Sequence, residues 1–426
     1  MGIAILLGSF IILLFLRVPV ALCLVVSSIL TGFYMQIPLE VIGQHMLNAL
    51  NSFSLLAIPL FILAGEIMGQ GGISTRLIEL SNLLVGRFRG GLAMVNVVTC
   101  MFFGGITGSA VADASSIGSI MIPMMTKKGY DKDYSVAVTC TGSIQGVIVP
   151  PSHNLILYSL AAGGVSISSL FMAGIVPGVV LCLALMFASY IIAVRRNFPK
   201  EAPIPREKWN RIIVNGLFSL TTAAIIIGGI LFGIFTANES AAIAVLYAFI
   251  ICLGVFREIK FKQILLIFTE TFRKLSAVLF LISASAAFSF FLDLLQVPDM
   301  VFHAMTSISN NKIVLLIMIN LFLLLLGMIM DMAPIILVAT PILLPIVTQV
   351  GMDPVQFGII LMLNLGIGLL HPPVGSALFV GCSIGGISME QVFKAMIPLL
   401  GVLLIVLLGI TYIPWFTMFL PHMLIH

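Results

Sequence analysis

The sequence predicts an all-α polytopic membrane protein built from two inverted structural repeats. Three observations lead to this fold class: an apolar composition, an internal repeat, and a pair of helix breaks at matching positions. Hydrophobic residues make up 60% of the 426 residues and charged residues 8%, against about 25% charged in soluble domains. The mean hydropathy is +1.22. So much apolar surface excludes a soluble fold, and only helices or closed barrels satisfy their backbone in lipid.

The internal repeat joins residues 123–173 to residues 345–395 at a fixed offset of 222 positions, without a gap. Composition alone does not produce this many matches in one register. The identical pairs are Pro123/Pro345, Thr126/Thr348, Gly129/Gly351, Asp131/Asp353, Gly146/Gly368, Pro150/Pro372, Pro151/Pro373, Gly163/Gly385, Gly164/Gly386, Ser166/Ser388, Phe171/Phe393 and Ala173/Ala395.

Each copy of the repeat places a Pro-Pro dipeptide inside an apolar segment. Proline removes a backbone donor and breaks a helix. The sequence therefore predicts a broken transmembrane helix in each copy, over 134–162 and over 356–383. Paired helix breaks in the two halves of a membrane protein point to the binding site of a transporter.

Two apolar segments with a very short connection stand before each broken helix. Such a connection is too short and too uncharged for a surface loop. We expect re-entrant helical hairpins over 83–126 and 313–350, with tips at 104–115 and 327–334. Non-helical backbone at membrane depth is tolerated where it lines a cavity or is buried in protein.

One aspartate stands near each predicted hairpin tip. Asp113 lies ten residues before Pro123, and Asp331 lies ten residues before Pro341. This spacing predicts that the two aspartates are counterparts, with about one helical turn inserted in the second copy.

The apolar and polar segments divide the chain into four parts. They are an N-terminal membrane helix segment (1–39), the first repeat (40–194), a cytoplasmic loop with linking helices (195–259) and the second repeat (260–426).

The distribution of Lys and Arg predicts the orientation of these parts. The densest basic group lies in 195–211, which places that loop in the cytoplasm. The loop with Lys127, Lys128 and Lys132 is also basic, whereas its counterpart at 349–354 has neither Lys nor Arg. This asymmetry favours inverted copies.

The predicted tips and breaks are candidate binding sites. An interrupted helix exposes free carbonyls at one end and free amides at the other. Carbonyls and hydroxyls suit a hard cation, and amides at a helix N-terminus suit a carboxylate. We therefore expect two sodium-like sites, formed by the tips and broken helices, with an anion site between them. The candidate residues are Gly105, Thr107, Gly108, Ser109, Asp113, Ser115, Pro150, Pro151, Ser152, His153, Asn154, Asp331, Pro334, Thr340, Asn364, His371, Pro372, Pro373, Gly375 and Ser376.

Several candidates have a second interpretation. The Ser and Thr residues also fit helix caps, and Asp331 fits an N-cap as well as a functional intramembrane carboxylate. His153 and His371 fit either proton coupling or a neutral hydrogen-bonding role.

Two capping boxes are predicted away from the site. Thr236 with Glu239, and Ser388 with Gln391, have the spacing at which the two residues satisfy each other's free backbone amides.

Enzyme chemistry has little support in the sequence. The glycine-rich stretch 104–109 lacks the Gly-Lys-Ser/Thr of a phosphate-binding loop, and no His-Glu-x-x-His motif occurs. We expect no enzymatic activity and no cofactor.

Several motifs together resemble the large membrane (M) subunit of tripartite ATP-independent periplasmic (TRAP) transporters, the DctM-like proteins. They are Phe53–Met68, Gly108–Asp113, Pro123–Met125, Pro150–Ser152, Thr236-x-x-Glu239 and Pro372–Gly375. The resemblance implies a sodium-driven, elevator-type importer in the bacterial inner membrane. It implies two partners, a periplasmic substrate-binding protein and a small four-helix membrane subunit, and substrates that are small organic acids such as dicarboxylates, sialic acids and sugar acids.

The resemblance also implies positions for the sodium sites, at 104–115 with 146–154 and at 327–340 with 364–376. The chain departs from the family pattern at His153-Asn154, where an apolar residue usually follows Pro-Pro-Ser, and at His371, where threonine is usual. A histidine at 371 supplies no side-chain hydroxyl for coordination, whereas its backbone carbonyl remains available.

Other readings stay open at this stage. A stand-alone sodium- or proton-coupled anion carrier would have the same architecture. An ion channel fits the paired hairpins less well. The chain lacks the extra helices of fused forms, which implies a separate small subunit.

Overall fold

The computed structural model describes residues 1–201, 203–309, 311–372 and 374–424, and the elements in them are helices. Before residue 202 these are α1 (Gly2–Phe15), α2 (Val20–Tyr34), α3 (Leu39–Leu50), η1 (Phe53–Leu56), α4 (Ala57–Gln70), α5 (Ile73–Val85), α6 (Gly91–Thr107), α7 (Ala110–Lys127), α8 (Lys132–Ser143), α9 (Gln145–Ile148), α10 (His153–Ala161) and α11 (Ile167–Arg195). After it come η2 (Arg206–Lys208), α12 (Trp209–Leu231), α13 (Ala237–Phe249), η3 (Ile250–Val255), α14 (Phe261–Leu294), α15 (Val297–Ile308), α16 (Lys312–Ile329), α17 (Met332–Gln349), α18 (Pro354–Gly368), α19 (Ser376–Gly385), α20 (Met389–Tyr412) and α21 (Trp415–Leu424).

Seven helices in the described part of the chain are long and apolar enough to cross a membrane. They are Ile167–Arg195, Arg206–Leu231, Ala237–Val255, Phe261–Leu294, Lys312–Ile329, Met332–Gln349 and Met389–Tyr412. The pair α4 and α5, bent by 72°, adds up to one more span. These spans confirm the prediction of an all-α polytopic membrane protein.

Large apolar side chains cover the outer faces of the spans. Phe187 on α11, Leu217 on α12 and Ile405 on α20 are each more than 60% exposed. Exposure of such side chains to water would cost about 1.5–3 kcal/mol each, whereas lipid tails are as apolar as they are. The exposed faces are therefore the lipid-facing surface.

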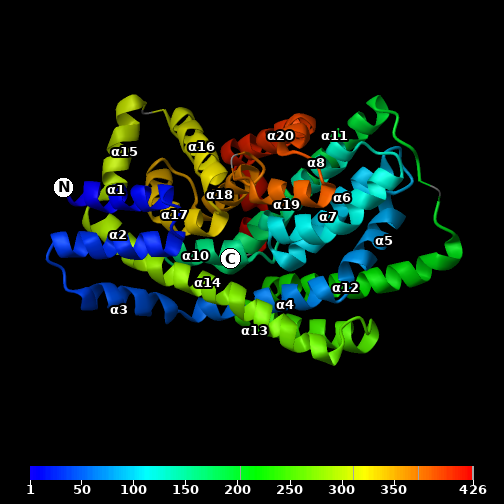
Figure 1. Cartoon of the computed structure of the whole chain (residues 1–426), viewed down its shortest axis with the longest axis horizontal. Coiled ribbons are helices and arrows are strands. Elements are labelled where there is room, and N and C mark those ends of the chain that lie inside the picture. The colour runs from blue at the N-terminus through cyan, green and yellow to red at the C-terminus, as the bar shows by residue number, and fades with distance from the viewer. Residues whose placement is uncertain (202, 310, 373, 425–426) are drawn as a thin grey trace.

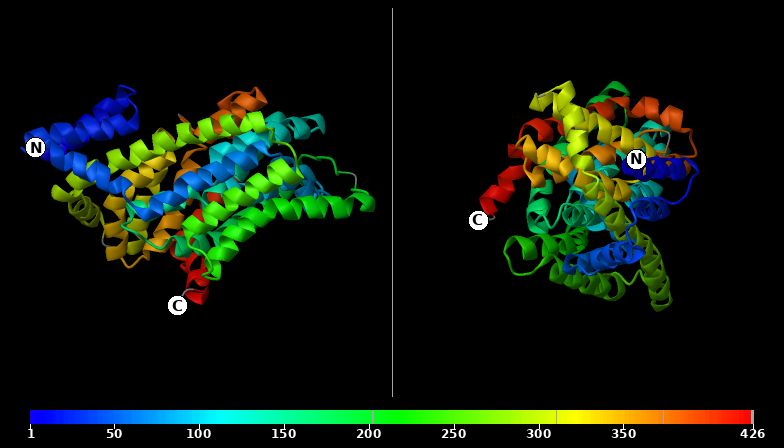
Figure 2. Two further views of the ribbon diagram at one scale, coloured as in Figure 1. Left: turned by 90° about the horizontal axis from the view of Figure 1, so that it is seen from below. Right: turned by 90° about the vertical axis from the view of Figure 1, so that its left-hand side faces the viewer.

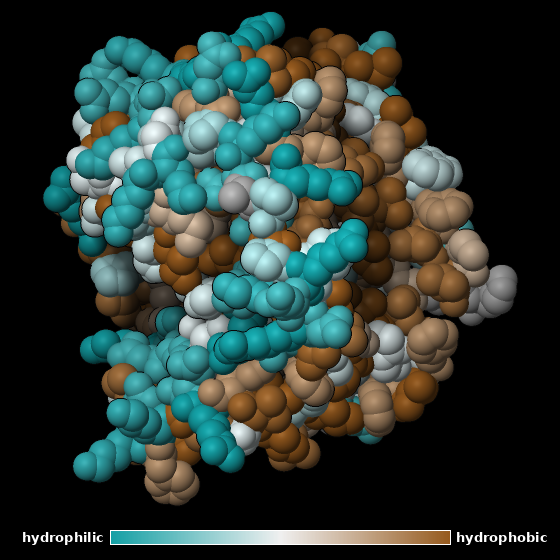
Figure 3. Space-filling view, turned by 90° about the vertical axis from the view of Figure 1, so that its right-hand side faces the viewer, coloured by the Kyte–Doolittle hydropathy of each residue, from teal (hydrophilic) through white to brown (hydrophobic). Residues whose placement is uncertain are grey.

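The two hairpins lie in different halves of an elongated molecule (Figure 1). Hairpin 1 consists of α6 and α7, and hairpin 2 of α16 and α17. The long helix α14 packs against α2, α3 and α4. It also packs against α17 of hairpin 2. The views in Figure 2 show α1 projecting at one end and the stretches 196–201 and 203–208 at the other. Seen from that second end, hydrophilic side chains gather over one part of the face and hydrophobic ones cover the rest (Figure 3).

The helices of the two halves keep the offset of 222 positions. α7 and α17 each have 18 residues and begin at Ala110 and Met332. Their N-caps are Ser109 and Asp331. The second copy therefore has no inserted turn, and that prediction was wrong. Asp331 matches Ser109, while the counterpart of Asp113 is Ile335.

Contacts also recur at this offset. The Tyr134 hydroxyl lies 3.5 Å from the backbone oxygen of Ser189, and Gln356 Nε2 donates to the backbone oxygen of Thr411 at 3.2 Å. Tyr134 and Gln356, like Ser189 and Thr411, are 222 positions apart. The matching bonds support the repeat, and the inverted orientation of the copies stays a prediction.

The two halves interlock around their broken helices. α10, after the first break, contacts α17 and α18 of the second half, and α19, after the second break, contacts α7 and α8 of the first. Tyr158 on α10 donates to the Pro354 carbonyl at 2.5 Å. The helix that follows each break is thus packed against helices of the other half.

Some boundaries differ from the expected ranges. Hairpin 1 begins at Gly91 rather than at residue 83, because residues 73–85 form the separate helix α5. Gly90 has a φ of +70°, which is not helical and separates α5 from α6. The capping box of Thr236 and Glu239 is confirmed. The predicted box at Ser388 was wrong, because that side chain makes no cap hydrogen bond.

Candidate functional site

Junction 1 is the contact between the tip of hairpin 1 and the first break, residues 149–152. The tip turns at Gly108, whose φ of +64° suits glycine. A Cβ at Gly108 would lie 3.0 Å from the Ser152 Cα, and a Cβ at Gly105 would lie 3.0 Å from the Pro150 carbonyl oxygen. The glycines let the two backbones approach.

One hydrogen bond joins the tip to the broken helix at junction 1, and a second lies within the break itself. The Asn154 Nδ2 donates to the Gly108 carbonyl at 3.2 Å and ties the start of α10 to the tip. The Ser152 hydroxyl donates to the Val147 carbonyl at 3.0 Å. This second bond serves a carbonyl that the helix break would otherwise leave free.

Asp113 is the buried carboxylate of junction 1, with 0% of its surface exposed. The Thr107 hydroxyl donates to its Oδ1. Its Oδ2 is buried and has no hydrogen-bond partner. A Cβ at Gly104 or Gly146 would lie 2.8 or 2.4 Å from that oxygen, so the glycines leave it room.

Junction 2 is the contact between hairpin 2 and the described residues of the second break, 369–372 and 374–375. Gly327 and Gly368 meet here: a Cβ at Gly368 would lie 2.6 Å from Gly327 backbone atoms. The Val374 amide donates to the Met328 carbonyl at 3.4 Å. Backbone contact between hairpin and break thus occurs in both halves.

Asn364 is the buried amide of junction 2. Its Nδ2 donates to the backbone oxygen and the Oδ1 of Asn320, at 3.1 and 2.8 Å. Asn320 in turn donates to the Thr411 hydroxyl at 3.3 Å. This orientation leaves the Asn364 Oδ1 buried without a partner. Our sequence analysis missed Asn320, although one polar amide inside the apolar segment 313–330 is a signal for it.

The remaining second-half candidates lie in varied surroundings. The hydroxyls of Thr340 and Ser376 are buried without a hydrogen-bond partner. His371 Nδ1 lies 3.0 Å from the Ile367 carbonyl, one turn earlier in the chain. Asp331 is exposed and its side chain makes no cap hydrogen bond.

The other candidates around the second break are prolines and a glycine, which have no polar side chain. Pro334 is buried, Pro372 is half-buried, and Gly375 adopts a φ of +38° as the N-cap of α19. Pro373 lies outside the described residues.

A cavity of about 680 Å³ borders hairpin 1. It brings together four of the predicted residues, namely Thr107, Ser109, Ser115 and His153. Glu66 of α4 and Lys274 of α14 form an ion pair in the same cavity. Neither Glu66 nor Lys274 was among the residues predicted from the sequence, although the position of Lys274 directly before the uncharged run 275–292 is a signal for it.

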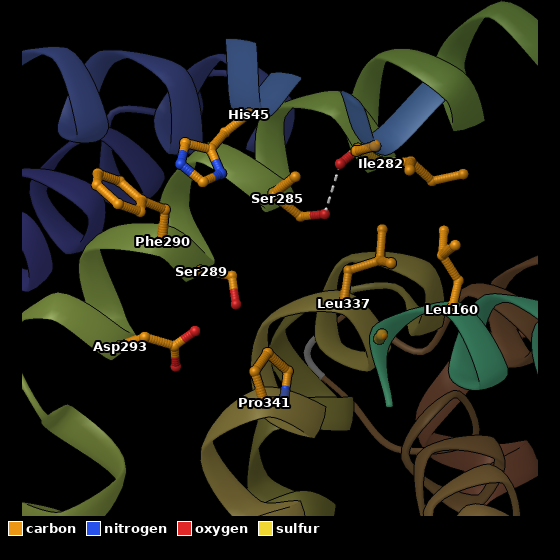
Figure 4. A pocket seen from close by; sticks show the side chains of 12 residues that line it. His45, Leu160, Ile282, Ser285, Ser289, Phe290, Asp293, Leu337 and Pro341 are labelled. Carbon is orange, nitrogen blue, oxygen red and sulfur yellow. Dashed lines mark hydrogen bonds between the residues drawn. The ribbon is translucent and has the colours of Figure 1, made fainter. Parts of the chain in front are cut away.

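A smaller cavity of about 330 Å³ borders hairpin 2 (Figure 4). His45 of α3 stacks on Phe290 of α14 with 4.2 Å between ring centroids. Ser289 and Asp293 of α14 face Pro341 of α17 across the cavity (Figure 4). Each hairpin therefore has one cavity between its second arm and a neighbouring helix.

Residues 7–416 match the family described as the tripartite ATP-independent periplasmic transporter, DctM component. The chain belongs to this family. The resemblance found in the motifs of the sequence is confirmed, and homology to transporter permeases agrees with the expectation that the chain is not an enzyme.

Curated relatives match over nearly the whole chain. An uncharacterized protein of Salmonella typhimurium, YgiK, is 43% identical over 98% of this chain and 97% of its own. The isethionate TRAP transporter permease protein DctMQ of Oleidesulfovibrio alaskensis is 38% identical over 97% of this chain and 66% of its own. The C4-dicarboxylate TRAP transporter large permease protein DctM of Vibrio cholerae is 36% identical over 96% of this chain and 94% of its own.

The fold has a solved neighbour among transporters. The Alcanivorax borkumensis YdaH transporter superposes with a TM-score of 0.65 over 88% of each chain, at 14% identity. At this identity the likeness extends to the fold alone.

Proposed function

We propose that this chain is the large permease subunit of a TRAP system that imports a small organic anion, coupled to an inward sodium gradient. Membership of the DctM family supports the transport role. The names of two relatives contain isethionate and C4-dicarboxylates, which are small anions. The proposal includes a periplasmic substrate-binding protein, a small membrane subunit and a location in the bacterial inner membrane.

The observation that carries the sodium proposal is a buried oxygen without a partner at each junction. These are Asp113 Oδ2 at junction 1 and Asn364 Oδ1 at junction 2. A buried polar atom without a hydrogen bond needs an explanation, and hard cations take carboxylate and amide oxygens as ligands.

A proton satisfies only one of these two oxygens. Protonation would give the Asp113 carboxyl group a donor, whereas the Asn364 amide does not titrate. A cation at each junction accounts for both atoms. This difference favours sodium over the alternative of proton coupling.

An elevator movement is the second part of the proposal. Each broken helix packs on the hairpin of the other half, so hairpins and broken helices form one interlocked unit. The two cavities lie along this unit, one beside α4 and α14 and the other beside α3 and α14. We take the unit to move as one body past these helices.

Uptake by proteoliposomes tests the proposal. The chain is reconstituted with the small subunit and the binding protein encoded beside it, and radiolabelled succinate, N-acetylneuraminate and isethionate are offered under an inward sodium gradient. We expect uptake of at least one acid that requires both partners and ceases when potassium replaces sodium. Uptake by the chain alone would contradict the tripartite proposal and favour the stand-alone carrier. Uptake driven by a proton gradient without sodium would contradict the sodium proposal.

A further inference from the structure

The ion pair between Glu66 and Lys274 lies in the wall of the larger cavity, which the tip of hairpin 1 also lines. Glu66 lies on α4 and Lys274 on α14, 208 positions apart. Helices α4 and α14 pack directly against each other. Side chains of Thr107, Ser109 and Ser115 line the same cavity. The cavity therefore combines hydroxyl groups of hairpin 1 with this ion pair.

Lys274 is open to the cavity in a way that Glu66 is not. The side chain of Lys274 is 50% exposed, and that of Glu66 is 19% exposed. An ammonium group has three donors, and Glu66 is its hydrogen-bond partner in the structure. Two donors remain for a further acceptor in the cavity.

The cavity has the size and chemistry of a small-molecule site. Its volume of about 680 Å³ falls in the range of about 300–1,000 Å³ that ligand pockets occupy. Lys274 is the one Lys or Arg among its described lining residues, which otherwise carry the Glu66 carboxylate, hydroxyls, His153, a glutamine and apolar groups. A cation with nearby hydroxyls suits an acid that carries a carboxylate or sulfonate and polar substituents.

We infer that Lys274 is the residue that binds the anionic group of the transported acid, in competition with Glu66. This inference rests on the proposed function and names the charge contact of its substrate site. Before the acid arrives, Glu66 neutralises Lys274. The acid's anionic group then binds the two remaining donors of the ammonium group and competes with the Glu66 carboxylate for its charge, while the hydroxyls of hairpin 1 hold its polar substituents.

The competition predicts opposite effects for the two partners. Lys274→Gln removes the charge-assisted contact and raises the KM roughly tenfold or more. Glu66→Gln removes the competitor and lowers the KM. Lys274→Arg keeps a cation and retains most of the affinity. The adjacent Arg273→Gln is the matched control, because Arg273 pairs with Glu270 on the same helix and is 80% exposed.

The double variant Glu66→Gln/Lys274→Gln separates this inference from a purely structural ion pair. A structural pair loses stability when one partner is removed and recovers when both are removed, because no unpaired charge remains. On the competition scheme the double variant keeps the high KM of Lys274→Gln.

The experiment measures initial uptake rates in the proteoliposome assay, with whichever of the three acids the wild type takes up fastest. Protein in the vesicles is quantified for each variant. A raised KM in both Lys274→Gln and the double variant, with a lowered KM in Glu66→Gln, is the expected result. Recovery of the wild-type KM in the double variant would overturn the inference alone. Absence of uptake of every acid by the wild type would instead overturn the proposed function and this inference with it.

Discussion

At junction 1 a carboxylate oxygen on hairpin 1 is buried without a partner, whereas at junction 2 an amide oxygen on the broken helix is buried without one. The positions do not correspond in the repeat: the counterpart of Asp113 is Ile335, and the counterpart of Asn364 is Gly142. The close backbone approach recurs in both halves, one position out of register: Gly104 meets Gly146, and Gly327, whose counterpart is Gly105, meets Gly368, the counterpart of Gly146. The repeat therefore preserves the meeting of tip and break, and each half places its polar oxygen independently.

Replacement of Asp113 by Asn is expected to have the largest effect. The amide keeps the size of the side chain and an acceptor for Thr107 but removes the negative charge. Loss of one member of a buried charge pair costs about 2–5 kcal/mol, so the sodium concentration for half-maximal uptake should rise roughly thirty-fold or more. Sodium-dependent initial rates measure this. An unchanged sodium dependence would remove Asp113 from the cation site.

Replacement of Asn364 by Ala tests the neutral site and should have an intermediate effect. It removes the free Oδ1 and leaves Asn320 without its donor. Loss of a buried hydrogen-bonding group costs about 1–3 kcal/mol. The sodium concentration for half-maximal uptake should therefore rise roughly tenfold. Gly142→Ala, at the counterpart position, is the control. Equal sodium dependence in Asn364→Ala and the wild type would mean that the amide is only structural.

Replacement of Asp331 by Asn should have the smallest effect. This carboxylate is exposed and makes no cap hydrogen bond. Surface substitutions of this kind stay within about 0.5 kcal/mol, so uptake should remain within roughly twofold of the wild type. The same sodium titration checks it. A loss of sodium-dependent uptake as large as that of Asp113→Asn would show that the two aspartates have equivalent roles. It would contradict the difference between the two junctions.

The features that sequence predicted best are those fixed by the backbone. Proline lacks a donor and glycine permits close approach, so Pro150, Pro372 and Gly108 mark breaks and turns without any knowledge of packing. The predicted insertion of one helical turn was wrong because it aligned the two copies on residues of the same type, Asp113 and Asp331. The helix caps set the register instead, with Asp331 opposite Ser109.

Contacts between distant segments could not be predicted in this way. Glu66 and Lys274 become partners only because α4 packs on α14, and no local pattern records that packing. The orientation of Asn364 likewise depends on Asn320 and Thr411, which come from two other helices.

Because the two halves interlock, the protein should tolerate a break in its polypeptide chain. Since α10 packs on α17 and α18 of the second half and α19 packs on α7 and α8 of the first, packing holds the two halves together independently of the connection between α11 and α12. A chain cut within that connection should remain one assembled particle. Either half produced without the other would expose the faces that its broken helix and hairpin normally cover, and both fragments would have to be made together to accumulate in the membrane.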